Sequence, residues 1–170
     1  MTNSALLVMD VQQGITDRFP DTTDYLARLG TAVDAARTAG IPVIYVVIGF
    51  RDGHPEVSTR NKSFGAVAGS GAFTVGDASS EIHPDLAPRP GDVVVTKKRV
   101  SAFAGSDLDM VLRGADAGHL VLAGIRATSV TRSQTRSDEA SIQVRTSAVG
   151  LSAYRAPVHS TLIRPPRPGV

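Results

Sequence analysis

Four apolar runs constrain the fold of this chain more than any other feature of its sequence. The runs Ala5 to Val11 and Ile41 to Ile48 lack the alternation of apolar and polar residues that a strand with one wet face shows. Such runs are typical of strands buried on both faces of a parallel sheet. Residues 92–98 and 119–124 are the next apolar stretches along the chain. The sequence therefore predicts four strands, of which the first two are buried on both faces.

Helical segments separate these strands. Between the first two, residues 24–38 carry apolar side chains at helical spacing, and Gly40 and Pro42 end the pattern. A second, shorter helix is expected over residues 106–113, opened by Ser106 or Asp107. We predict an α/β fold, a three-layer α-β-α sandwich around a mainly parallel sheet. A length of 170 residues favours one domain. The apolar side chains of the longer helix are Tyr25, Leu26, Leu29, Val33 and Ala36.

The composition excludes several classes of function. The chain has no cysteine, which rules out disulfides, thiolate catalysis and cysteine-based metal sites. Its apolar runs are far shorter than the roughly 20 residues of a membrane span, and its first residues lack the basic start of a signal peptide. We expect a cytoplasmic location and no membrane partner.

Charge is unevenly distributed along the chain. Residues 1–125 carry 11 Lys and Arg against 14 Asp and Glu, whereas residues 126–170 carry 7 Arg against 2 acids. The basic tail has no lysine and one aromatic residue, so it has little to stack on bases. We therefore expect no nucleic-acid partner.

Three strand ends are candidates for chemistry: Asp10, Lys97 with Lys98, and the junction of Gly124 with Ile125. Ligands in open α/β sheets bind outside the carboxyl ends of the strands. A carboxylate at the end of a buried run is costly unless it is paired, and a lysine at a nearby strand end is its simplest partner. A structural ion pair or a helix-capping aspartate would produce the same pattern.

Other polar groups carry weaker signals. Asp52 and His54 are too few for a metal site, and we interpret them as solvated loop residues. The glycine-rich stretch of residues 65–76 matches no phosphate-binding motif and is expected to be a loop. We predict no metal and no cofactor. Three serines without a nucleophile motif are interpreted as surface or capping residues: Ser101, Ser129 and Ser133.

In order, these pieces resemble the isochorismatase-like hydrolase superfamily, which includes isochorismatases, nicotinamidases and N-carbamoyl amide hydrolases. The resemblance covers roughly residues 5–130 and implies a Rossmann-like hydrolase fold. The residues that carry it are LLVMDVQQGI (6–15), RFP (18–20), AGIPVIYV (39–46), RNKSF (60–64), VVVTKKRVSAFAGSDLD (93–109) and LVLAGI (120–125).

The resemblance implies roles for particular residues. Asp10 matches the family's catalytic aspartate, and Lys97 its catalytic lysine, with Lys98 as the alternative if the register differs by one. The family's cysteine lies six residues after the glycine of the LVLAGI strand, and that position is Val130 here. A backbone oxyanion hole near a cis peptide would fall at Arg126 and Ala127, where arginine departs from the usual small residue.

Valine cannot act as a nucleophile, and Ser129 beside it would need a register change and a strong base. Some members of the superfamily that lack the cysteine cleave an ether by acid catalysis and water attack. We therefore predict a hydrolase of a small metabolite, cleaving an ether or C–N bond by acid–base chemistry of Asp10 and Lys97. Phe19, Phe103 and the 49–76 loop would shape its pocket.

The tail departs from the family pattern. Residues 131–170 are rich in Ser, Thr and Arg, and the C-terminal elements are expected to be incomplete, with a strand over 143–149 and a helix fragment over 158–163. A reading-frame shift near residues 124–126 would explain this composition. The alternative function is an inactive member or truncated product that acts as an oligomerising scaffold. A homo-oligomer is expected if the C-terminus folds.

Overall fold

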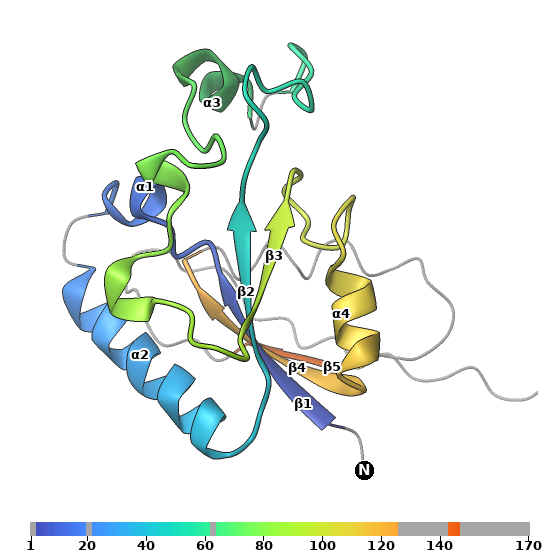
Figure 1. The fold of residues 1–170 in the computed structure, drawn as a ribbon. Coiled ribbons are helices and arrows are strands. Elements are labelled where there is room, and N and C mark those ends of the chain that lie inside the picture. Colours follow the sequence, from blue (N-terminus) through green and yellow to red (C-terminus); the bar gives the residue numbers. More distant parts are fainter. Residues whose placement is uncertain (1–2, 20–21, 62–63, 126–142, 147–170) are drawn as a thin grey trace, which may run out of the picture.

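A five-stranded parallel sheet forms the centre of the protein (Figure 1). The computed structural model describes residues 3–19, 22–61, 64–125 and 143–146. The strands lie in the order β3-β2-β1-β4-β5, so the first strand is in the middle of the sheet. Their bounds are β1 Asn3–Met9, β2 Val43–Ile48, β3 Val93–Lys97, β4 Ala117–Gly124 and β5 Gln143–Thr146.

Two helices cover opposite faces of this sheet (Figure 1). Helix α2 (Thr23–Thr38) connects β1 to β2, and α4 (Leu108–Gly114) connects β3 to β4. The smaller elements are α1 (Gln13–Thr16), α3 (Gly65–Ser70) and two 3-10 turns, η1 (Ala78–Ser80) and η2 (Pro84–Leu86). None of the helices within the described ranges has the length and apolar character needed to cross a membrane.

The core has two layers because successive side chains of a strand point to opposite faces. Leu7 and Met9 of β1 pack in the layer beneath Leu112 of α4. Leu6 and Val8 pack in the other layer, beneath α2. All seven positions of β1 except the first two are buried, as the lack of polar alternation predicted. The three-layer α/β fold is confirmed.

The sequence-based boundaries are close to the observed ones, with a few corrections. The five apolar residues predicted for the long helix are the ones that α2 buries. The second helix begins at Leu108, and Ser106 Oγ accepts a hydrogen bond from its backbone N–H at 3.1 Å. The prediction of a loop throughout residues 65–76 is wrong, because α3 occupies its first half.

Gly124, the last residue of β4, allows the backbone of β4 to approach the end of β1 closely. Its φ of 123° lies in the region that favours glycine, and an added Cβ would stand 2.1 Å from Met9 O. Its N–H donates to Tyr25 Oη at 2.9 Å, which joins α2 to the strand end, and Ile125 N donates to Met9 O at 3.1 Å. Burial of Tyr25 raises its pKa, although the hydrogen bond from Gly124 works in the opposite direction.

Replacement of Gly124 by alanine should therefore be severe. We expect Gly124→Ala to lower the free energy of unfolding by at least about 3 kcal/mol, because backbone atoms of the central strand would have to move. Gly114→Ala is the matched control, since a Cβ there meets no atom within 4 Å, and it should change stability by less than about 1 kcal/mol. Urea unfolding measures both, and similar effects would contradict this account.

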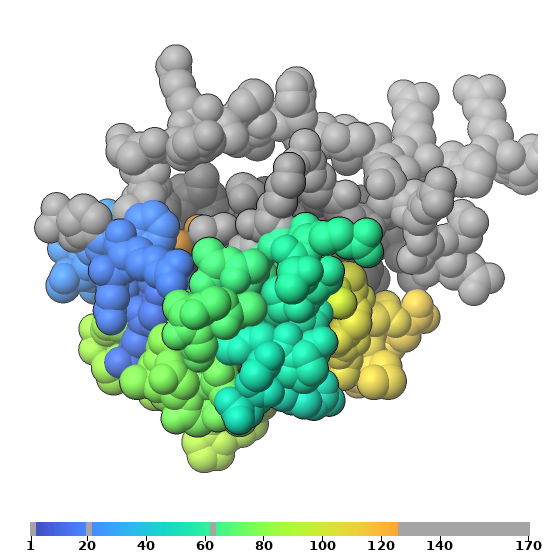
Figure 2. Space-filling view, turned by 90° about the horizontal axis from the view of Figure 1, so that it is seen from above, coloured from blue at the N-terminus to red at the C-terminus, as the bar shows by residue number. Residues whose placement is uncertain are grey.

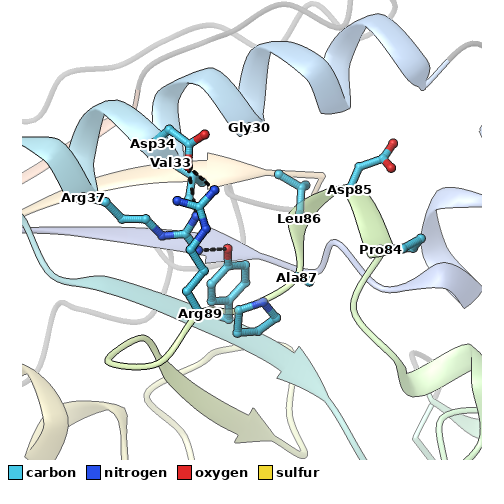
Figure 3. Close-up of a pocket in the computed structure, with 11 residues that line it drawn as sticks. Gly30, Val33, Asp34, Arg37, Pro84, Asp85, Leu86, Ala87 and Arg89 are labelled. Atoms are coloured by element: carbon cyan, nitrogen blue, oxygen red, sulfur yellow. Dashed lines mark hydrogen bonds and ion pairs between the residues drawn. The ribbon is translucent and has the colours of Figure 1, made fainter.

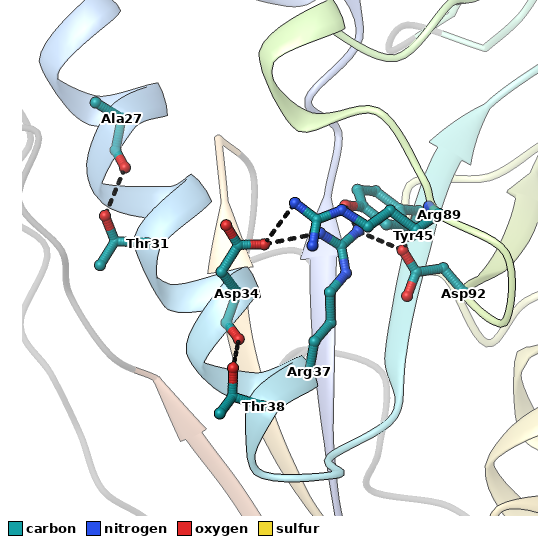
Figure 4. A network of polar contacts seen from close by, with 8 residues as sticks. All are labelled: Ala27, Thr31, Asp34, Arg37, Thr38, Tyr45, Arg89 and Asp92. Atoms are coloured by element: carbon teal, nitrogen blue, oxygen red, sulfur yellow. Dashed lines mark hydrogen bonds and ion pairs between the residues drawn. The ribbon is translucent and has the colours of Figure 1, made fainter.

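A polar network joins the amino-terminal end of β3 to α2 (Figure 4). Arg37 donates to Asp92, to Asp34 at 3.1 Å and to Tyr45 Oη at 3.2 Å. Arg89 completes it through Asp34 at 3.1 Å and through its backbone N–H to Asp92 at 2.9 Å. Burial of Asp92 raises its pKa, but the hydrogen bonds and charges of Arg37 and Arg89 outweigh burial and lower it.

A carboxyl group with a lowered pKa stabilises the fold above its unfolded-state pKa of about 3.9 and loses that contribution as pH falls through the folded value. We expect Asp92→Asn to lower the free energy of unfolding by about 1–2 kcal/mol at pH 7. This difference should shrink steadily below about pH 4. Asp109→Asn, which removes an exposed helix ion pair with Arg113, should have an effect below about 0.5 kcal/mol at pH 7. Urea titrations across pH test the prediction, and a difference independent of pH would refute it.

Candidate active site

An ion pair lies at the carboxyl ends of the central strands. Lys97 Nζ donates to Asp10 Oδ2 at 2.8 Å, and the two side chains are 2% and 0% exposed. Asp10 follows β1 directly, and Lys97 is the last residue of β3. The pair anticipated from the sequence therefore forms, and Lys97 is the lysine that makes it.

The ion pair passes across the end of β2, which separates β1 from β3. Asp10 has a φ of 56°, a left-handed conformation that aspartate tolerates better than most residues. Its N–H donates to Val46 O at 2.9 Å, which fixes the backbone turn on β2. Lys97 Nζ also donates to Val100 O at 3.3 Å, so the chain after β3 folds back over the ammonium group. Two charges that are buried this completely are stable only when they pair closely with each other and with further hydrogen-bond partners.

Gln12 fixes the segment after Asp10 to its surroundings. The side chain is fully buried, its Nε2 donates to Ile48 O and Ser80 O at 2.7 Å each, and its Oε1 accepts from Ile48 N at 2.7 Å. Ile48 is the register partner of Lys97. The amide group therefore links the chain beyond Asp10 to the strand end beside Lys97. In the sequence, the only signal of this role is a polar residue two positions after Asp10, at the end of an apolar run.

Aromatic residues pack the segment that follows β2. Phe50, Phe64 and Phe73 are buried with Ile15 and Ile48 in a separate apolar cluster. The rings of Phe50 and Phe64 meet edge to face at 5.4 Å. Backbone hydrogen bonds join Phe50 to the segment around residue 73 at 2.8 and 3.0 Å. These residues therefore form an ordered wall, which no short-range pattern in the sequence indicated.

His54 belongs to the same wall, and its interpretation as a solvated residue is wrong. It is 4% exposed, its ring centroid lies 5.1 Å from that of Phe50, and its Nε2–H donates to Ala72 O at 2.8 Å. Figure 2, seen from above the carboxyl ends, shows the segment after β2 and the residues from α3 to η1 side by side on this face. This face is therefore formed by the loops of residues 49–76, which the apolar cluster of Phe50, Phe64 and Phe73 holds in place.

A cavity of about 260 Å³ lies elsewhere, between α2 and the segment around η2 (Figure 3). Leu86 and Val33 line it together with Arg37, Arg89 and Tyr45 of the polar network. It lies on the α2 face of the sheet and includes neither Asp10 nor Lys97. We assign the candidate site to the ion pair, because it lies at the carboxyl ends of the strands, where open α/β sheets bind their ligands.

The other residues suggested by the sequence lie in different surroundings. Phe19 is 40% exposed beyond α1, and Phe103 packs partly buried against the α4 core layer. Their contribution to a pocket stays a prediction. Arg126, Ala127 and Val130 lie outside the described residues, as do Ser129 and most of the tail. Residues 143–146, within the predicted strand 143–149, form β5.

Comparison with known proteins identifies the family. The profile of the isochorismatase domain matches residues 4–138, most of the chain. The chain therefore belongs to the isochorismatase family. Among curated relatives, the ureidoacrylate amidohydrolase RutB of Stutzerimonas stutzeri is 29% identical over 164 residues, which covers 81% of this chain and 64% of that protein. The corresponding protein of Caulobacter vibrioides is 36% identical over 119 residues, covering 62% of this chain and 52% of its own.

Solved structures support the same family. A cysteine hydrolase from Pseudomonas syringae pv. phaseolicola superimposes with a TM-score of 0.63 at 26% identity, covering 73% of this chain and 60% of that one. N-carbamoylsarcosine amidase from Thermoplasma acidophilum gives 0.60 at 25% identity, covering 72% and 67%. The chain thus spans less than two thirds of the length of several of the relatives that it matches.

Loss of the Gln12 amide should destabilise the protein. Gln12→Met keeps the length of the side chain but leaves three backbone groups, two of them buried, without their partner. We therefore expect the free energy of unfolding to fall by about 3 kcal/mol. Gln13→Met is the matched control, because Gln13 is half-buried and its side chain has no hydrogen bond among the described residues. Its effect should stay below about 0.5 kcal/mol. Guanidinium unfolding compares them, and equal effects would sink the assignment.

Proposed function

We propose that this protein is a hydrolase of a small metabolite that uses Asp10 and Lys97 without a cysteine nucleophile. The buried ion pair at 2.8 Å is the observation that carries the proposal. A carboxylate and an ammonium group held at the carboxyl edge of a parallel sheet lie where open α/β folds bind their ligands. Membership of the isochorismatase family supports the assignment.

Cleavage of a C–N bond is the reaction that we favour. Two of the curated relatives carry the name ureidoacrylate amidohydrolase, and a structural relative at 25% identity is named an N-carbamoylsarcosine amidase. Both names describe cleavage of a bond between carbon and nitrogen in a ureido or carbamoyl group. The same residues could instead cleave an ether, with Asp10 as the proton donor.

The chemistry assigns one role to each charge. The Asp10 carboxylate takes a proton from a water molecule as the water oxygen attacks the carbonyl carbon. The Lys97 ammonium stabilises the negative charge that develops on the carbonyl oxygen. The proton then passes from Asp10 to the leaving nitrogen as the C–N bond breaks. Water replaces the thiolate as the nucleophile, since the chain contains no cysteine.

Single-charge variants test this proposal. We expect Asp10→Asn and Lys97→Met each to reduce kcat by at least about 100-fold, because each removes a group that acts in the transition state. Asp17→Asn, at an exposed carboxylate just beyond α1, should keep the wild-type rate. Turnover is measured with a panel of N-carbamoyl compounds, nicotinamide and isochorismate.

Folding must be checked in parallel, because removal of one partner of a buried ion pair leaves the other unpaired. The double variant Asp10→Asn with Lys97→Met removes both charges and serves as the folded reference by circular dichroism. Wild-type turnover that persists in folded Asp10→Asn would refute the mechanism. Absence of turnover across the whole panel would favour the alternative, an inactive scaffold, whose assembly a native mass measurement would show.

A further inference from the structure

The outer edge of β3 is a surface that the proposed function does not use. β3 is the last strand in the order of the sheet, and β2 is its neighbour on the inner side. Within the described ranges, no strand pairs with its outer side. Val93 and Val94, at the start of β3, are 39% and 45% exposed. An edge of this kind presents unpaired backbone groups to any strand that approaches it.

The backbone groups of Val94 and Thr96 point away from the sheet. Gly49 N donates to Lys97 O at 3.3 Å, so the backbone of Lys97 faces β2. The N–H and C=O groups of successive strand residues point to alternate sides. Val95 therefore also faces β2, whereas Val94 and Thr96 face outward. These two residues carry the donors and acceptors that a further strand would need.

The edge lacks the devices that usually block such pairing. Natural edge strands carry a proline, a bulge or an outward-pointing charge. β3 pairs with β2 in continuous register over Val93–Lys97, without a bulge. This segment contains no proline, and its one charged residue, Lys97, turns inward to Asp10. The outer edge of β3 is therefore open to another strand.

The two ends of β3 carry net charges of opposite sign. At the carboxyl end, Lys98 and Arg99 line a cavity of about 280 Å³ with Glu56, whose carboxylate pairs with Arg51. Three cations there outnumber one carboxylate. At the amino end, three carboxylates outnumber two guanidinium groups in the network and cavity beneath α2. The residues of this acidic end are Asp34, Asp85, Asp92, Arg37 and Arg89.

Opposite charges at the two ends favour one particular partner. Two copies of such a strand attract each other when they run in opposite directions, because each basic end then meets an acidic end. The same strands in parallel orientation would bring like charges together. The edge is thus complementary to itself, which is the condition for a contact between identical subunits about a twofold axis.

We propose that β3 pairs with β3 of a second copy of this chain, antiparallel and with the twofold axis at Val95. Val94 of each copy then exchanges backbone hydrogen bonds with Thr96 of the other. The two sheets join into one continuous sheet, and the exposed side chains of Val93 and Val94 are covered. This contact requires no turnover, so it holds or fails independently of the proposed hydrolysis.

Cysteine cross-linking tests the register, because the chain contains no cysteine of its own. In the proposed pairing, a Val94→Cys copy faces a Thr96→Cys copy with Cα atoms about 5.5 Å apart, within the range of a disulfide. An equal mixture of the two variants should therefore form a disulfide-linked dimer under mild oxidation. Each variant alone sets its two thiols on a diagonal roughly 7–8 Å apart, which is too far.

Met110→Cys is the control for random collision, because Met110 is 69% exposed on α4, outside the edge. Its mixture with Thr96→Cys should show no more cross-linking than either variant alone. Non-reducing electrophoresis measures the linked fraction. Equal cross-linking in the mixture and in the separate samples, or none in any of them, would overturn the register.

Sedimentation equilibrium measures the association itself. We expect a concentration-dependent dimer that Val94→Pro weakens at least about tenfold, since proline removes an outward N–H. Proline is tolerated at such a position of an edge strand, so this variant should fold. Lys98→Glu, which reverses the charge of one residue at the basic end, should also weaken the dimer.

Arg113→Glu makes the same change of charge at a distance from the edge. Arg113 lies in the last turn of α4, which leads into β4 on the far side of β1. This variant should associate as the wild type does. A wild type that is monomeric at all concentrations, or a dimer that neither Val94→Pro nor Lys98→Glu weakens, would refute the proposed interface.

Discussion

The ion pair between Asp10 and Lys97 is the interaction on which the rest of the site depends. It crosses the end of β2, so it forms only when three strands pair in the observed register. A shift of one residue would turn either side chain to the other face of the sheet. The pair is also costly to bury, and Val100 O, just beyond β3, accepts a further hydrogen bond from the ammonium group.

Loops around the ion pair are fixed by buried contacts. Gln12 satisfies three backbone groups from β2 and η1, and the aromatic cluster around Phe50 packs the segment after β2. Because these side chains are buried and hydrogen-bonded or packed, they hold the chain at the strand ends in place. The cavity beneath α2 lies apart from the strand ends, and its ion pairs stabilise the fold.

Sequence patterns predicted the parts of the structure that depend on local periodicity. The buried strands and the apolar face of α2 followed from residues close together in the chain. The pairing of Asp10 with a lysine was expected because both residues stand at strand ends, although they are 87 positions apart. Sequence patterns did not indicate helix α3, the burial of His54 or the hydrogen bonds of Gln12. For His54 and Gln12 the relevant hydrogen bonds join distant segments, such as Gln12 with Ile48 and Ser80, which lie 36 and 68 positions away. Short-range propensity carries no information about such contacts.

The sequence by itself determined the layered α/β architecture, the family motifs and the absence of a cysteine. Apolar runs of this length must be buried on both faces, and a chain without a thiol must rely on other groups. Only the tertiary structure decided that Lys97, rather than Lys98, pairs with Asp10. Neighbouring residues at a strand end point in opposite directions, and the sheet register determines which one reaches the buried carboxylate.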